Sequence, residues 1–130
     1  MELDKYSRGM GTDGMPGGLS SQERFVKCTF TKMNVLPAED EASAVGQFFH
    51  ILHSVEQQKG CCQVAPGKYE YTIYSSCINL DDMIYYYTTY DNNQITGVRM
   101  KDFDTSGTEL VEVPIVDSQQ IAFTTKTINE

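Results

Sequence analysis

The chain has 130 residues and a mass of 14.6 kDa, with 40% hydrophobic, 11% aromatic and 22% charged residues. This composition indicates one soluble domain that buries a core of its own, and it excludes a chain that is disordered throughout. Ten basic residues against eighteen acidic ones give a net charge of −8. Because this charge repels phosphate backbones and anionic lipids, we expect no nucleic-acid partner and no membrane partner.

The sequence has no stretch close to the roughly 20 apolar residues that cross a bilayer, and residues 1–5 lack the basic and apolar parts of an export signal. We therefore expect a cytoplasmic protein. Its cysteines, none in a C-x-x-C spacing, are Cys28, Cys61, Cys62 and Cys77. This spacing favours reduced thiols over a zinc site or a disulfide framework.

The first expected elements are a loop and a helix. Residues 1–19 are rich in glycine and predict a loop, and the residues from Ser20 to Glu23 have the form of a capping box. We expect a helix over 21–33, with Lys27 and Lys32 in water. Its expected buried stripe consists of Phe25, Val26, Cys28, Thr29, Phe30 and Met33.

A second helix is expected over 38–57. Pro37 precedes it, and the acidic run 39–41 suits the positive end of a helix dipole. Apolar residues recur at helical spacing, namely Val45, Phe48, Phe49, Leu52 and Val55.

The remaining pattern predicts strands. Residues 69–74 are β-branched and aromatic, and turn sequences separate two further strands at 83–90 and 94–100. Alternation over 110–115 predicts a fourth strand, with Pro114 at its end or at a sheet edge. We expect an α+β fold in which two helices precede an antiparallel β-meander. The expected layout is one domain over 1–130, with a loop at 1–19, helices within 20–57 and a sheet within 69–115.

Two short motifs suggest cofactor or metal sites but lack their context. The glycines Gly9, Gly11 and Gly14 match a dinucleotide fingerprint as a string, but no strand precedes them and no helix follows directly. His50 and His53 could share one side of the second helix, but a third metal ligand is missing. We expect a loop and a pair of ordinary histidines, and neither a metal nor another cofactor.

Arg24 is an isolated cation in the first turn of the first helix. A positive charge there opposes the helix dipole by roughly 0.3 to 1 kcal/mol unless something compensates. The Arg24 side chain could form an ion pair with Glu23 or be solvated, or it could have a functional role.

Several ordered blocks of the sequence resemble the C-terminal third of the choloylglycine hydrolase family. The similarity covers nearly the whole chain up to Ile121. The matching blocks are 6–11, 14–17, 20–27, 47–52, 69–77 and 87–95.

The resemblance implies a fold and a reaction. The family comprises conjugated bile acid hydrolases and penicillin V acylases, which are N-terminal nucleophile hydrolases with an αββα sandwich. They cleave linear amides with an N-terminal cysteine, whose own α-amino group serves as the base. Arg24 matches the family's active-site arginine in the motif Ser-Ser-x-x-Arg-Phe-Val, where a cation supports the nucleophile.

The chain departs from the family pattern at its start. Glu2 follows Met1, so the expected terminal thiol is missing, and the family's other catalytic residues belong to a part that these blocks do not match. The resemblance therefore implies a C-terminal portion that needs the N-terminal portion of the enzyme as its partner and is inactive alone. The substrate of the complete enzyme would be a bile acid conjugate or a penicillin-type amide, and the sequence does not decide between them.

Two further expectations follow. Family members are commonly homo-oligomers, and half of a sandwich would leave an apolar face in water, so we expect self-association. The alternative function is a non-catalytic α+β module that binds a ligand or partner through its aromatic sheet, where the run 85–87 consists of tyrosines.

Overall fold

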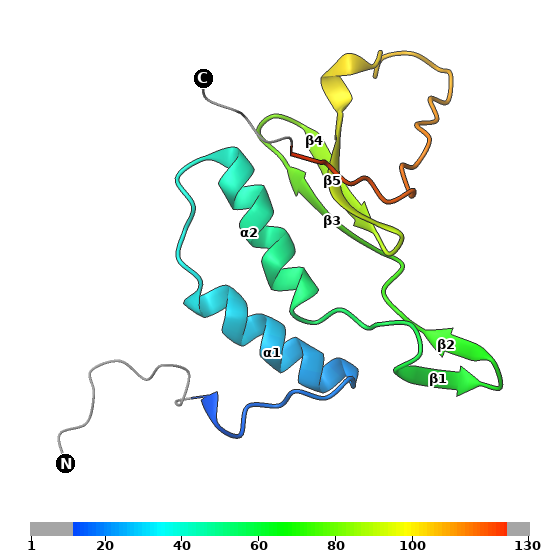
Figure 1. Cartoon of the computed structure of the whole chain (residues 1–130). Helices are drawn as coiled ribbons and strands as arrows, with labels where there is room; N and C mark the ends of the chain where they lie inside the picture. The colour runs from blue at the N-terminus through cyan, green and yellow to red at the C-terminus, as the bar shows by residue number, and fades with distance from the viewer. Residues whose placement is uncertain (1–11, 125–130) are drawn as a thin grey trace, which may run out of the picture. The chain divides into compact units, whose positions relative to one another are not determined.

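The computed structural model describes residues 12–124, and the contacts of the chain form two compact units, one ending at Tyr71 and one beginning at Thr72. Two helices come first and antiparallel strands follow, which confirms the expected α+β fold (Figure 1). Across residues 12–124, no helix is both long enough and apolar enough to span a bilayer.

Helix α1 (Ser21–Asn34) begins at the predicted capping box. The Ser20 hydroxyl oxygen accepts a hydrogen bond from the Glu23 backbone N–H at 3.3 Å, and the same hydroxyl donates to the Glu23 carboxylate at 2.6 Å. The first of these bonds satisfies a backbone donor that has no partner inside the helix, and the second holds the two side chains together. The prediction of a helix over 21–33 is confirmed.

Helix α2 (Glu41–His53) is shorter than the expected 38–57. It begins after Asp40, whose carboxylate accepts from the Ser43 backbone N–H at 2.9 Å and from the Ser43 hydroxyl at 2.6 Å. A capping side chain requires an extended backbone at its own position, so the helix cannot begin earlier. Ser54 is the C-cap, and Val55 lies beyond the helix rather than in its apolar stripe.

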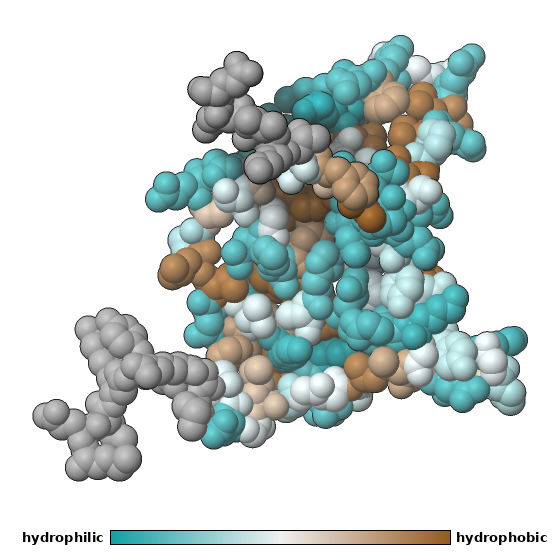
Figure 2. All heavy atoms as spheres, viewed as in Figure 1, coloured by the Kyte–Doolittle hydropathy of each residue, from teal (hydrophilic) through white to brown (hydrophobic). Residues whose placement is uncertain are grey.

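The expected buried stripe of α1 is wrong. No residue of α1 is buried, and Phe25 and Met33 are 72% and 78% exposed. Phe49 of α2 is buried, at 2% exposed. Helical spacing places apolar side chains on one face, but that face is buried only where another element packs on it, and among residues 12–124 nothing covers these side chains of α1. Apolar surface, drawn in brown, interrupts the hydrophilic surface in Figure 2.

A small hairpin follows the helices in the first unit. Strand β1 (Cys62–Ala65) pairs antiparallel with β2 (Lys68–Glu70), and Gly67 has a φ of 70° in the connecting turn. The single strand expected over 69–74 is wrong: β2 ends at Glu70, residues 71–73 belong to no strand, and the next strand begins at Tyr74.

The second unit contains the predicted meander. Strands β3 (Tyr74–Asn79), β4 (Ile84–Thr89) and β5 (Asn92–Arg99) form an antiparallel sheet in the order β3-β4-β5. The strands expected over 83–90 and 94–100 are confirmed within this sheet.

A short 3₁₀ helix (Met100–Asp102) follows β5, and the chain then has no regular structure over 103–124. The fourth strand expected over 110–115 is wrong. Alternation alone does not form a strand without a partner to pair with, and Pro114 has no N–H to donate to one.

Candidate functional site

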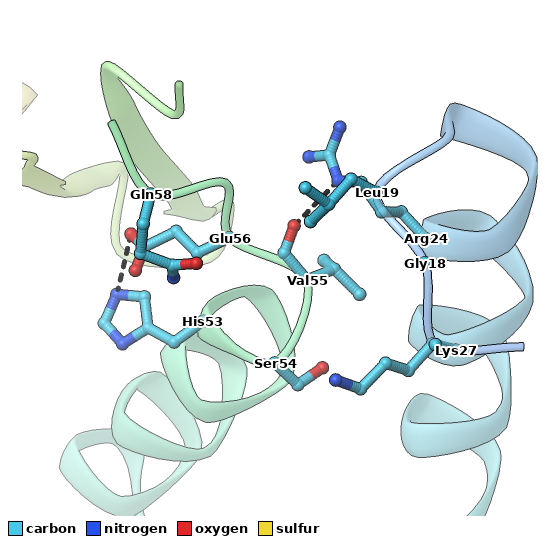
Figure 3. A pocket seen from close by; sticks show the side chains of 10 residues that line it. Gly18, Leu19, Arg24, Lys27, His53, Ser54, Val55, Glu56 and Gln58 are labelled. Atoms are coloured by element: carbon cyan, nitrogen blue, oxygen red, sulfur yellow. Dashed lines mark hydrogen bonds and ion pairs between the residues drawn. The ribbon is translucent and has the colours of Figure 1, made fainter. Parts of the chain in front are cut away.

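A cleft of about 390 Å³ lies in the helical unit, where α1 begins and the chain leaves α2 (Figure 3). It is lined by the loop before α1, by two cationic side chains of α1, and by the residues that follow the last turn of α2. The lining residues are Gly17, Gly18, Leu19, Arg24, Lys27, His53, Ser54, Val55, Glu56 and Gln58.

Arg24 is half-buried in this cleft and has a fixed orientation. Its Nε atom donates a hydrogen bond to the Val55 carbonyl oxygen at 2.8 Å (Figure 3). The ion pair with Glu23, one of the alternatives that the sequence left open, is not formed among residues 12–124, where the Glu23 carboxylate accepts from the Ser20 hydroxyl. Among residues 12–124, the two terminal guanidinium nitrogens of Arg24 have no hydrogen-bond partner. They remain available to a ligand or to another part of a protein.

A second hydrogen bond reinforces this arrangement. The Gln57 side chain, 5% exposed, donates from Nε2 to the Leu19 carbonyl oxygen at 3.0 Å. The Arg24 bond therefore connects α1 to the segment after α2, and the Gln57 bond connects that segment to the loop before α1. Sequence reasoning missed Gln57, because a glutamine after a helix carries no signal of its partner.

Other charged groups line the cleft. Lys27 is half-buried and points toward Ser54 in Figure 3. The His53 Nε2 atom lies 4.0 Å from a Glu56 carboxylate oxygen. Two cations on one side of a cleft can stabilise an anionic or developing negative group, and the carbonyl-bound Arg24 can do so in a fixed direction.

The start of α1 also has a stable negative charge. The hydrogen bond from the Ser20 hydroxyl, with backbone N–H groups of Ser20 and Gly18, lowers the pKa of the Glu23 carboxyl. A carboxylate at this position complements the helix dipole. It offsets the unfavourable placement of the Arg24 cation in the same turn.

The other sequence candidates are not brought together. Gly9 and Gly11 lie outside the described residues, and Gly14 has a φ of 83°. His50 is exposed, whereas the ring of His53 lies 5.9 Å from that of Phe49. Within residues 12–124, no three side chains of the metal-ligating types are grouped as a metal site would need.

None of the four cysteines forms a disulfide bond, and the Cys62 thiol donates to the Glu70 carboxylate at 3.7 Å. Burial raises the pKa of the Cys77 thiol, which makes it less reactive at neutral pH. None of the cysteines lines the cleft with Arg24.

Residues 1–113 match the sequence model of the linear amide C–N hydrolases, choloylglycine hydrolase family. The chain belongs to the choloylglycine hydrolase family. This confirms the resemblance noted in the sequence, and the fold agrees with it.

Relatives support the same membership. The chain is 55% identical over 120 residues to a bile salt hydrolase/transferase of Lactiplantibacillus plantarum, a match that covers 92% of this chain and 37% of the relative. It is 34% identical over 111 residues to a bile salt hydrolase/transferase of Bifidobacterium longum, covering 85% of this chain and 35% of the relative. The chain thus spans little more than a third of the length of these relatives.

Solved structures agree. A mutant conjugated bile acid hydrolase from Clostridium perfringens superposes with a TM-score of 0.78 at 30% identity, over 93% of this chain and 37% of that one. The penicillin V acylase from Agrobacterium tumefaciens shares the fold, with a TM-score of 0.60 at 19% identity over 72% of this chain and 30% of that one.

Proposed function

We propose that this chain forms the C-terminal portion of a cysteine-dependent N-terminal nucleophile hydrolase that cleaves a linear amide, with Arg24 in its active site. The observation that carries the proposal is the geometry of Arg24. Its Nε atom is held by the Val55 carbonyl, and its terminal nitrogens are unpartnered among the described residues, in a motif of the choloylglycine hydrolase family. Bile salt hydrolase relatives at up to 55% identity favour a conjugated bile acid as substrate over penicillin V.

The chemistry assigned to Arg24 is electrostatic. A guanidinium that presents two free nitrogens can stabilise a thiolate nucleophile or the negative oxygen that develops when the nucleophile attacks the amide carbon. The Val55 carbonyl fixes the guanidinium plane before substrate arrives, so no free energy is lost in ordering it during the reaction. Arginine suits this role because it stays charged at every physiological pH.

The nucleophile belongs to the remaining part of the enzyme. Cys28, Cys61, Cys62 and Cys77 are internal residues without a free α-amino group to act as base, and the chain spans only 37% of its Lactiplantibacillus plantarum relative. A polypeptide of these 130 residues is therefore inactive alone, and the N-terminal portion of the enzyme is its partner.

A chimeric enzyme tests the proposal. This chain would replace the matching segment of the Lactiplantibacillus plantarum relative, and amino acid release from glycine and taurine bile conjugates would be measured beside hydrolysis of penicillin V. We expect activity on the bile conjugates, reduced about a hundredfold in kcat/KM by Arg24→Ala. Lys32→Ala, an exposed cation on the same helix, is the matched control and should leave kcat/KM unchanged.

Two results would contradict the proposal. Full activity of the folded Arg24→Ala chimera would remove Arg24 from the active site. Amino acid release by the isolated chain would show that the reactive centre lies within these residues.

A further inference from the structure

The second unit holds a stretch of its own C-terminal region against the β4–β5 turn (Figure 1). The Tyr87 hydroxyl oxygen accepts a hydrogen bond from the Val116 backbone N–H at 3.0 Å. The Asn92 Nδ2 atom donates to the Val116 carbonyl oxygen at 3.1 Å. Both main-chain polar atoms of Val116 are thus satisfied by side chains of the sheet, while its own side chain is 40% exposed.

Asn92 is the centre of this contact. It is 1% exposed, and its Oδ1 atom accepts from the Gln120 backbone N–H at 3.2 Å and from the Gln94 backbone N–H at 3.1 Å. A buried carboxamide left without partners would cost free energy, so Asn92 favours the state in which residues 116–120 are in place. The Asn93 backbone N–H adds a bond to Gln119 Oε1 at 3.2 Å.

The chain that leads to this contact is exposed. Every residue over 103–124 has an exposed side chain, and the segment contains no helix or strand. Three hydrogen bonds to main-chain atoms of Val116 and Gln120 and one to the Gln119 side chain hold residues 116–120, which we call the docked segment, at the end of a long tether. A tethered segment has an effective concentration of order mM, so a few hydrogen bonds suffice to keep it bound.

We infer that Tyr87 and Asn92 form a docking site for an extended peptide main chain, and that the chain's own docked segment binds and releases there as one cooperative unit. This inference rests on the contacts of Val116 and Asn92 and not on the proposed amidase function. The site selects an extended backbone with a free N–H and C=O at the position of Val116, because those atoms are what Tyr87 and Asn92 contact.

Amide hydrogen exchange on the full chain tests the cooperative unit through a matched pair of variants. Gln120→Pro removes the backbone N–H that Asn92 accepts, whereas Gln120→Ala keeps that N–H and removes only the side chain. We expect Gln120→Pro to speed exchange of the Val116 amide about tenfold, although its partner Tyr87 is untouched, and Gln120→Ala to leave it unchanged. Unchanged exchange of the amides of β4 and of residues 95–99 in β5, which make no contact with the docked segment, shows that the sheet is retained.

Unaltered Val116 protection in Gln120→Pro would overturn the inference, because the contacts would then be independent. Tyr87→Phe gives a second test from the other end of the segment. It removes the acceptor of the Val116 N–H and should also speed exchange of the Gln120 amide, while retained protection of Gln120 would contradict a single unit.

Dilution distinguishes the chain's own segment from that of a second copy. Protection of Val116 that is constant over a hundredfold dilution supports docking within one chain. Protection that falls on dilution would show exchange of segments between copies and would overturn the assignment to the chain's own segment.

Discussion

Arg24 and Val55 are joined by a hydrogen bond from a side chain in the first turn of α1 to a main-chain carbonyl 31 residues later, with a donor–acceptor distance of 2.8 Å. A cation at the positive end of a helix is unfavourable by itself, and this bond gives it a partner that is not a carboxylate. Within the described part of the chain no carboxylate pairs with the guanidinium, and the bond to Val55 fixes its direction. That combination is what an electrostatic role in catalysis requires.

The Gln57 side chain should contribute measurably to the stability of the helical unit. Gln57→Ala removes the donor to the Leu19 carbonyl and should lower the free energy of unfolding by about 1 kcal/mol. Urea unfolding followed by far-UV circular dichroism measures the change. The neighbouring exposed Gln58 provides the control, and a Gln58→Ala change as large as that of Gln57→Ala would contradict the assigned bond.

The Asp40 cap should determine where α2 begins. Asp40→Ala removes both bonds to Ser43 and should lower the free energy of unfolding. Glu39→Ala, next to it in the sequence and without a hydrogen bond among the described residues, should have little effect. Equal losses in helix content by circular dichroism for the two variants would argue against a capping role.

Acid should weaken the helical unit through Glu23 and Asp40. Hydrogen bonds from Ser20 and from Ser43 hold the pKa of these carboxyls below their ordinary values. The folded state therefore binds fewer protons than the unfolded chain, so the stabilisation is complete above the unfolded pKa values of about 4 and is lost as the pH falls through the lower folded values.

Urea midpoints measured from about pH 6 down to about pH 3 test this dependence. Glu23→Gln and Asp40→Asn together should flatten the curve. A midpoint that falls as steeply in this double variant as in the unaltered chain would assign the acid sensitivity to other groups.

We also propose that the isolated chain self-associates through the apolar face of α1. Phe25 and Met33 are 72% and 78% exposed, and exposed aromatic and apolar side chains of this kind promote association. Replacing both by serine should shift the sedimentation velocity profile toward the monomer. Lys32→Ser, on the same helix, is the control and should leave the sedimentation profile unchanged. If the unaltered chain itself sediments as a sharp monomer, the proposal is wrong.

The sequence predicted those structural elements that depend on interactions between residues close together in the chain. The Ser20–Glu23 box predicted the start of α1, because both partners lie within one turn of each other. The Pro66-Gly67 pair is a local turn signal, and the structure places a hairpin turn there with a positive φ at Gly67. The pattern over 69–74, by contrast, was interpreted as one continuous strand.

Expectations that depended on distant partners were wrong or incomplete. The spacing of Phe25 and Met33 predicts a shared face, but it does not say whether anything covers that face. Alternation over 110–115 predicts a strand only where a neighbouring strand is free to pair. In the candidate site, the sequence pointed to Arg24 through its motif, whereas the Val55 carbonyl and Gln57 became visible only when the chain was folded.

The contact at Val116 has a consequence for sequence variation. Tyr87 and Asn92 hold atoms that every residue except proline possesses, so replacements at Val116 by other amino acids preserve its attachment to the sheet. The side chain at position 116 is therefore free to vary without loss of the two hydrogen bonds that attach this position to the sheet.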